Sequence, residues 1–354
     1  MNYIGSKFSI LDFIEDTIND FVKPKDTKIT LCDIFSGTGS VGKFFKRKGY
    51  NVISNDIQYY SYITAKHYIE NNIELKFEKL KSTGIEPFEF LNNIYGKEGF
   101  IFKNYSIEGT KGQEYERQYF SADNAKKIDA IRMKIEDWKN EEKITEAEYT
   151  YLIASLIEST DKVANTASVY EAFLKKLKTS ASKPLELKPV ELIITEEKRK
   201  YKVYNENSND LIMRIEGDIL YMDPPYNTRK YDTNYHILET ITLYDEPEIK
   251  GKTGVRSEQT KRSKYCLKKE AINAFEELVK NAKFKYLLLS YNDEGIIPIE
   301  DIKRIMSKYG SYKCYKRKHK RFKADSKRNY LKDFTIEYIH CIEKKNQVKK
   351  ATIK

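Results

Sequence analysis

The strongest candidate for chemistry in this sequence is a run of four residues: Asp223, Pro224, Pro225 and Tyr226. They directly follow the apolar run ILYM at residues 219–222. Because proline has no backbone N–H to donate to a sheet, the strand predicted over this run must end where Asp223 begins. The strand therefore delivers a carboxylate, a rigid bend and an aromatic ring to the same point.

These residue types suit the methylation of an exocyclic amine. The lone pair of such an amine is delocalised into its ring, so the nitrogen is a poor nucleophile. The carboxylate of Asp223 and the carbonyl of Pro224 can accept its two N–H bonds and aim the lone pair at an electrophilic methyl group. Pro225 stiffens the bend, and Tyr226 offers a face on which a planar base can stack. This chemistry needs neither a thiolate nor a metal ion.

A second candidate site is a glycine-rich turn near the N-terminus. Residues 29–35 (ITLCDIF) form a β-rich apolar run, and GTGSVG at residues 37–42 has the spacing G-x-G-x-x-G before a short amphipathic helix. A strand, a glycine turn and a helix in this order place backbone N–H groups against a nucleotide. Asp56, at the end of the next predicted strand, can accept hydrogen bonds from ribose hydroxyls.

The glycine turn alone does not select its ligand, because NAD-binding and S-adenosylmethionine-binding domains both use it. Asp33, just before the turn, would repel a pyrophosphate but can hold a cationic amino or sulfonium group. We therefore expect S-adenosylmethionine as the cofactor. The alternative from another class is an NAD-dependent Rossmann oxidoreductase, which leaves the strand ending in Asp223 unexplained.

The elements that must position these residues indicate an α/β fold. Strand, turn, helix and strand over residues 29–56 predict a parallel sheet covered by helices. Helical spacing dominates residues 79–200, and residues 146–178 read mostly as helix. We predict a Rossmann-like S-adenosylmethionine-dependent methyltransferase core, with a mainly helical insert. The predicted division is a core of residues 1–78 and 201–343, an insert at 79–200 that is the candidate target-recognition region, and a disordered basic tail at 344–354.

The charge balance favours a polyanionic partner. Lys and Arg number 64 against 53 Asp and Glu, a net charge of +11, which is typical of nucleic-acid-binding proteins. Basic segments follow Tyr226, and the last of them, residues 312–330, interleaves Lys and Arg with Tyr and Phe, which suits phosphate contact and base stacking. A solvated hairpin with its lysines extended into water is the alternative for that segment. The predicted DNA-binding residues are Arg229, Lys230, Lys261, Arg262, Lys316, Arg317, Lys318, Lys320 and Arg321.

Several other classes of site find no support in the sequence. The four cysteines form no C-x-x-C pair, and the four histidines are not at zinc-ligand spacing, so we expect no metal. No apolar run approaches the ~18 residues of a membrane helix, and the N-terminus lacks the apolar centre of a signal peptide. We expect a protein of the reducing cytoplasm with no membrane association.

The glycine turn and the proline-rich segment together resemble the adenine-N6 DNA methyltransferases, specifically their Dam-like alpha group. DIFSGTGSV at residues 33–41 is similar to the cofactor motif of that family, and DPPY at residues 223–226 to its catalytic tetrad. NYIGSK at residues 2–7 looks like the extra cofactor-side motif that precedes the glycine motif in this group. The resemblance covers about residues 1–78 and 201–343.

This resemblance implies roles for individual residues. Asp223, Pro224 and Tyr226 would hold a flipped adenine, and Pro225 completes the tetrad. Asn207 stands where family members often carry an acid near the cofactor adenine, a departure that leaves this contact open. With Asn207, the implied cofactor-binding residues are Tyr3, Gly5, Lys7, Asp33, Phe35, Gly37, Gly39 and Asp56.

The resulting expectation is a site-specific methyltransferase that acts on the N6 amine of adenine in double-stranded DNA, as part of a restriction-modification system. A paired restriction endonuclease is left open. So are an RNA adenine substrate and a cytosine-N4 DNA methyltransferase, although the latter more often carries serine in place of Asp223. Cytosine-C5 chemistry is disfavoured, because no cysteine here follows a proline. A nucleic-acid-binding protein without catalysis is the remaining class.

Overall fold

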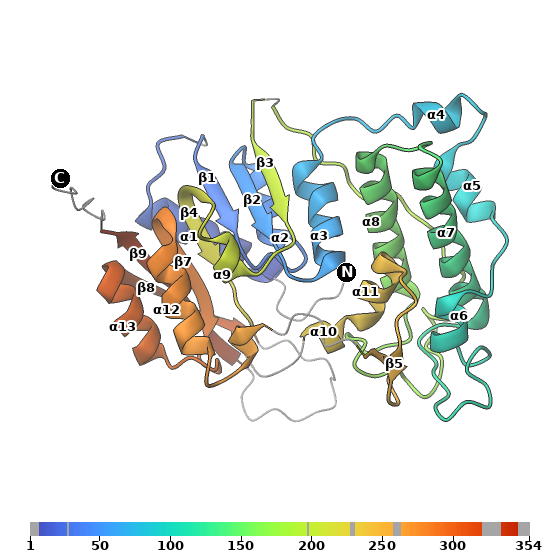
Figure 1. Cartoon of the computed structure of the whole chain (residues 1–354). Coiled ribbons are helices and arrows are strands. Elements are labelled where there is room, and N and C mark those ends of the chain that lie inside the picture. The colour runs from blue at the N-terminus through green and yellow to red at the C-terminus, as the bar shows by residue number, and fades with distance from the viewer. Residues whose placement is uncertain are drawn as a thin grey trace, which may run out of the picture.

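A seven-stranded sheet forms the centre of the protein (Figure 1). The computed structural model describes residues 7–26, 28–196, 198–226, 231–257, 263–320 and 334–345, without the side chains of residues 231, 232, 319 and 320. The strand order is β3-β2-β1-β4-β7-β9-β8. The strands are β1 (Thr30–Asp33), β2 (Asn51–Asn55), β3 (Tyr201–Tyr204), β4 (Glu216–Met222), β7 (Lys283–Asn292), β8 (Gly310–Lys320) and β9 (Phe334–Lys344).

The first five strands of this order run parallel, whereas β9 is antiparallel to both of its neighbours, β7 and β8. Parallel strands are covered on both faces, which explains their nearly continuous apolar runs. In β4, Ile219 and Tyr221 face one hydrophobic cluster, and Leu220 and Met222 face the other. This alternation is the two-residue period of a strand.

Helices cover the two faces of the sheet. The face of Tyr221 is covered by η1 (Lys7–Ile10), α1 (Leu11–Phe21), α2 (Ser40–Arg47) and η2 (Lys66–Glu70). The face of Met222 is covered by α9 (Ser208–Leu211), η3 (Lys264–Cys266), α12 (Ala271–Asn281) and α13 (Ile299–Tyr309).

A group of helices stands beside the sheet, with α3 (Tyr59–Ala65) and α11 (His236–Leu243) between the two (Figure 1). The other helices of this group are α4 (Glu78–Lys81), α5 (Pro87–Asn93), α6 (Phe100–Tyr105), α7 (Ala122–Asn140), α8 (Glu146–Val163) and α10 (Tyr231–Asn234). They share one hydrophobic core, to which α3 contributes Tyr60 and α11 contributes Leu238 and Ile241. A two-stranded hairpin, β5 (Ile249–Lys250) and β6 (Val255–Arg256), follows α11.

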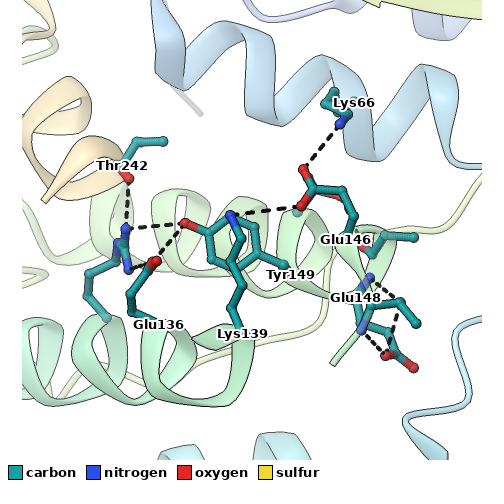
Figure 2. A network of polar contacts seen from close by, with 11 residues as sticks. Lys66, Glu136, Lys139, Glu146, Glu148, Tyr149 and Thr242 are labelled. Atoms are coloured by element: carbon teal, nitrogen blue, oxygen red, sulfur yellow. Dashed lines mark hydrogen bonds and ion pairs between the residues drawn. The ribbon is translucent and has the colours of Figure 1, made fainter. Parts of the chain in front are cut away.

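The buried guanidinium of Arg132 ties α7 to α11. It donates to the carbonyls of Ile241 (3.0 Å) and Thr242 (3.1 Å), and to Glu136 on its own helix at 2.7 Å. These carbonyls belong to the last turn of α11, where helix carbonyls lack partners within the helix. Figure 2 shows Thr242 near Glu136 and Tyr149. At the start of α8, the Glu146 carboxylate lies between the ammonium groups of Lys66 and Lys139.

The predicted α/β, Rossmann-like fold is confirmed. The helix expected over residues 146–178 is shorter, because α8 ends at Val163 and Ala164 adopts an extended backbone. The side chain of Asn165 then organises an irregular segment, since its amide donates to the carbonyls of Gln118 and Leu174, both at 2.9 Å. Asparagine competes with helical backbone for hydrogen bonds in this way. The division into core and insert stays a prediction.

Candidate active site

The candidate site lies where the direction of strand addition reverses. From β1 the chain adds β2 and β3 on one side, and from β4 it adds β7 on the other. Ligands of open α/β sheets bind at such a switch point, beyond the carboxyl ends of the strands. Asp33 is the last residue of β1 and is paired with Tyr221, and Asp223 follows directly after β4. The two acids predicted for cofactor and substrate therefore share one edge of the sheet.

Both carboxylate oxygens of Asp223 are engaged. The ammonium of Lys7 lies 3.0 Å from Oδ2, and the hydroxyl of Tyr226 donates to Oδ1 at 2.6 Å. Burial raises the pKa of Asp223, while Lys7 and Tyr226 act to lower it. The structure therefore supplies two donors that favour the charged, hydrogen-bond-accepting form of this carboxylate.

The ring of Tyr226 is held from several sides. It packs edge-on against Tyr291 with ring centroids 4.9 Å apart, and the Lys7 ammonium lies 4.6 Å from its centroid. The Tyr226 carbonyl accepts from the N–H of Ile296 at 2.8 Å. Gly295 leaves room for this packing, because a Cβ there would lie 2.0 Å from a ring atom of Tyr291. Pro224, between Asp223 and Tyr226, is buried.

The glycine turn forms the other half of the site. Gly37 and Gly39 have φ of 50° and 68°, in the left-handed region that glycine adopts without strain. The Gly37 N–H donates to Oδ2 of Asp56 at 2.7 Å, and the Gln58 N–H donates to Oδ1 at 2.9 Å. Burial raises the pKa of Asp56 to about 6. The turn and the acid of the second strand are thus physically linked.

The third glycine of the pattern has a different role. A Cβ on Gly42 would lie 2.5 Å from Cδ1 of Ile69, which belongs to η2. Gly42 therefore permits the close packing of α2 against η2, one of the known uses of glycine in this kind of turn.

Asp33 is suited to a ligand that carries positive charge and N–H groups. It is 1% exposed, and its Oδ1 atom has no hydrogen-bond partner within the described ranges. Burial and the nearby charges of Asp223 and Asp56 raise its pKa well above the usual range. A cation would stabilise the ionised form of Asp33, and a donor would satisfy its oxygen.

The other predicted cofactor residues are Phe35, Asn207, Tyr3 and Gly5. Phe35 packs its ring edge-on against Tyr265 at 5.0 Å. The side-chain oxygen of Asn207 accepts from the N–H of Asn209 at 2.9 Å and caps α9. Tyr3 and Gly5 lie outside the described residues.

The predicted DNA-binding residues differ in their surroundings. Lys316 and Lys318 are exposed on one face of β8. Arg317 faces α1 instead, where it donates to Asp12 at 2.7 Å and lies 4.7 Å from the ring centroid of Phe13. Outside the described side chains lie Arg229, Lys230, Lys261, Arg262, Lys320 and Arg321.

Two acids near the site were not predicted from the sequence. Glu337 on β9 is 8% exposed, and its pKa is raised first by burial, with Asp223 and Asp293 adding to the rise and Lys7 opposing it. Glu239 on α11 accepts from the N–H groups of Tyr59 (3.0 Å) and Tyr60 (2.9 Å), at the start of α3. Each acid interrupts an apolar face of its element, and that interruption is the sequence signal for both.

Within the described part of the chain, no group of three His, Cys, Asp or Glu side chains is arranged to hold a metal ion. The helices in those same residues are all too short or too polar to cross a lipid bilayer.

Comparison with known proteins identifies the family. The model of the D12 class N6 adenine-specific DNA methyltransferases matches residues 3–305. The type II methyltransferase M.NlaIII of Neisseria lactamica is 44% identical over 346 residues, which cover 97% of this chain and 99% of the relative. M.FokI of Planomicrobium okeanokoites is 43% identical over 351 residues, which cover 97% of this chain and 53% of the relative. M.CviAII of Paramecium bursaria Chlorella virus 1 is 35% identical over 329 residues, or 92% and 93% of the two chains. No solved structure gives a significant match.

These matches span the glycine turn, the helical region and the strand that ends at Asp223. The predicted relationship to adenine-N6 methyltransferases is confirmed, and with it the predicted enzyme class and DNA substrate. The chain belongs to the D12 class N6 adenine-specific DNA methyltransferases.

Proposed function

We propose that Asp223, Pro224 and Tyr226 carry out the adenine-N6 methylation of this family with S-adenosylmethionine as the methyl donor. The observation that carries the proposal is the meeting of Asp33 and Asp223 at the switch point of the sheet. A methyl group can pass from donor to base only if their two sites adjoin, and these two strand ends are neighbours about 4.8 Å apart.

The residues of the turn side fit this cofactor. When bound, S-adenosylmethionine supplies an electrophilic methyl group on a positively charged sulfur. Asp33 would hold its cationic part, since a buried carboxylate oxygen there lacks a partner in the described structure. Asp56 would accept from the ribose hydroxyls, with the turn at Gly37 and Gly39 beside it. The same cofactor would be contacted by Phe35, Asn207, Tyr3, Gly5 and Lys7.

The residues of the tetrad fit the amine. The Asp223 carboxylate and the Pro224 carbonyl accept the two N–H bonds of the adenine amine, so that its lone pair points toward the methyl group. Tyr226 stacks on the base, and Pro225 restricts the bend that sets these positions. A base that reaches this buried edge must leave the DNA duplex, as in other enzymes that modify bases.

We also propose where DNA contacts the chain. Lys316 and Lys318 are exposed on β8, and β9 begins near them, at the catalytic edge of the sheet. Arg317 is expected to contribute less to these contacts, because its guanidinium already pairs with Asp12 and Asp16 of α1. Further contacts are proposed at Arg229, Lys230, Lys261, Arg262, Lys320 and Arg321, and base reading within residues 79–200.

The names of the relatives support a biological setting. M.NlaIII is a type II methyltransferase, and the modification methylase StsI of Streptococcus sanguinis is 38% identical over 313 residues. We propose that this chain modifies DNA within a restriction-modification system, alongside a cognate endonuclease that cuts the same unmethylated sequence. The expected location is the cytoplasm, where that DNA is accessible.

Expression in a host that lacks DNA methylation, followed by long-read mapping of N6-methyladenine, tests the reaction and yields the recognition sequence. Asp223→Asn keeps the size of the side chain but loses its charge. We expect it to abolish methylation while S-adenosylhomocysteine still binds in calorimetry. Asp218→Asn, on the same strand, is the matched control, because Asp218 accepts the backbone N–H of Thr30 at the start of β4, away from the tetrad. Methylated cytosine, or methylated adenine with Asp223→Asn, would contradict the proposal.

A further inference from the structure

Three charged groups lie on one face of the sheet at its catalytic edge. Tyr221 faces α1, and by the two-residue period of a strand Asp223 lies on the same side. Glu337 shares this face with Ile339 of β9, which packs in the same cluster. Lys7 precedes α1 on this face and is 7% exposed.

Lys7 interacts with both acids, directly with Asp223 and through its charge with Glu337. Its ammonium pairs with Oδ2 of Asp223 at 3.0 Å. One strand, β7, separates Asp223 from β9, so the backbones of the two acids are at least ~10 Å apart. The four-carbon stem of lysine is flexible, so its ammonium can change position without movement of the backbone.

Glu337 is the acid that lacks a full set of partners. Its Oε2 atom is buried and accepts no hydrogen bond from the described residues. A buried carboxylate oxygen without a donor is costly, so the site is poised to receive one.

The nearest cation by register is already engaged. Arg317 pairs with Glu337 across β8 and β9, but its guanidinium binds Asp12 and Asp16 of α1. On the β7 side, Asn292 is paired with Glu337, and the carboxylate of Asp293 accepts from Thr335 at 2.7 Å. Among these neighbours, Lys7 is the cation that Glu337 can share with Asp223.

The engagement of Asp223 creates a conflict with substrate. Its Oδ1 accepts from Tyr226 and its Oδ2 pairs with Lys7, whereas the proposed mechanism requires it to accept from the adenine amine. Each carboxylate oxygen can accept a second donor, so the amine competes with Lys7 for the Oδ2 side of Asp223, and the release of Lys7 is part of the proposal. An ammonium displaced into a buried site without an acceptor would lose several kcal/mol.

We propose that Glu337 is a positioning residue that receives the Lys7 ammonium when the target adenine displaces it from Asp223. The proposal rests on the proposed function, because it takes Asp223 as the acceptor of the adenine amine. Lys7 thus has two stations. Before the base enters, Lys7 keeps the carboxylate of Asp223 ionised. Once the base is in place, the Lys7 ammonium moves to Glu337.

The test measures base entry separately from methyl transfer. DNA carrying 2-aminopurine next to the mapped target adenine keeps the N6 amine of the target, and the probe fluoresces when the target base leaves the stack. We expect Glu337→Gln to lower this fluorescence and the single-turnover rate by about tenfold, the scale of one charged hydrogen bond. Calorimetric binding of S-adenosylhomocysteine and the melting temperature should stay as in the wild type. Glu343→Gln, an exposed acid on the same strand that pairs with Lys285, is the matched control and should change nothing.

A second variant separates positioning from a structural role. Lys7→Met removes the group that occupies Asp223, so Lys7→Met/Glu337→Gln should recover the 2-aminopurine fluorescence that Glu337→Gln alone loses. Wild-type fluorescence in Glu337→Gln, or no recovery in the double variant, would overturn the proposal. Failure of the proposed function is distinguishable, because the wild type would then leave no methylated adenine in the mapping experiment.

Discussion

The hydroxyl of Tyr226 donates a hydrogen bond to Oδ1 of Asp223 at 2.6 Å, so the aromatic residue of the tetrad also sets the charge state of its acid. A ring used only for stacking needs no hydroxyl. This donor favours the ionised carboxylate against the burial that disfavours it.

Tyr226→Phe should therefore shift the pH dependence of catalysis while it preserves stacking. The pKa of Asp223 is already raised by burial, and loss of the hydroxyl raises it further. Activity requires the ionised acid and is lost as pH falls through this pKa, so the acidic limb of the single-turnover rate should move to higher pH. We expect a loss of about tenfold near neutral pH. Tyr286→Phe on the same strand as Tyr291 is the control, and an unshifted limb in Tyr226→Phe would contradict the assignment.

Cofactor affinity should depend on the ionisation of Asp56. Its pKa is raised to about 6, and the ionised form is the better acceptor for ribose hydroxyls. The affinity for S-adenosylhomocysteine should be constant well above this pKa. Below it, affinity should fall by up to about tenfold per pH unit. Calorimetry from about pH 5 to about pH 8, a range that includes this pKa, measures how the affinity changes with pH. Burial also raises the pKa of Asp33, so the contribution of Asp56 is the difference between wild type and Asp56→Asn. Parallel profiles for the two proteins would exclude Asp56 from the cofactor site.

The two faces of β8 should differ in their contribution to DNA binding. Lys316 and Lys318 are exposed, whereas Lys313 on the opposite face pairs with Asp20 at 2.7 Å. Replacing both Lys316 and Lys318 by Ala should reduce the slope of log K against log salt by about 1.8, because each phosphate contact contributes ~0.9.

The matched control replaces two paired lysines, Lys313 and Lys285, and removes the same total charge. Its salt slope should stay close to that of the wild type, because neither ammonium is proposed to touch phosphate. Equal reductions in the two double variants would mean that net charge, and not the face of β8, determines binding.

Arg132 should be important for the stability of the protein. Its side chain is 3% exposed and ties α7 to the last carbonyls of α11. Arg132→Met leaves these carbonyls without their donor and Glu136 with Tyr149 in place of its ion pair, and should lower the free energy of unfolding by about 3 kcal/mol. Lys134→Met, a more exposed change on the same helix, should cost about 0.5 kcal/mol or less. Urea denaturation measures both, and equal values would show that the buried network contributes nothing.

The sequence was sufficient for the parts of the site that depend on local order. Two prolines in a row end a strand, so Asp223 could be placed at a strand end from the sequence alone. A glycine turn of this spacing follows a strand, which places Gly37 in the same way. That both strand ends are neighbours depends on the sheet order, which local sequence patterns do not specify and the structure provides.

Contacts between distant segments could not be predicted in this way. Lys7 was expected on the cofactor side, and its ion pair with Asp223 joins residues 216 positions apart through the packing of η1. The opposite orientations of Lys316 and Arg317 follow from the strand period, but a run of alternating basic residues does not say which face α1 covers. The early end of α8 depends on hydrogen bonds of Asn165 to partners as far as Gln118.

Helix α11 belongs to two neighbourhoods at once. Its Glu239 holds the start of α3, three residues beyond Asp56, while its apolar side completes the core of the helical group and Arg132 binds its end. An exchange of residues 79–200 between relatives would therefore break these contacts and leave the apolar side of α11 exposed to solvent. New sequence specificities in this family should arise by grafts that carry α11 and the β5–β6 hairpin along, and not by transplanting the middle of the chain alone.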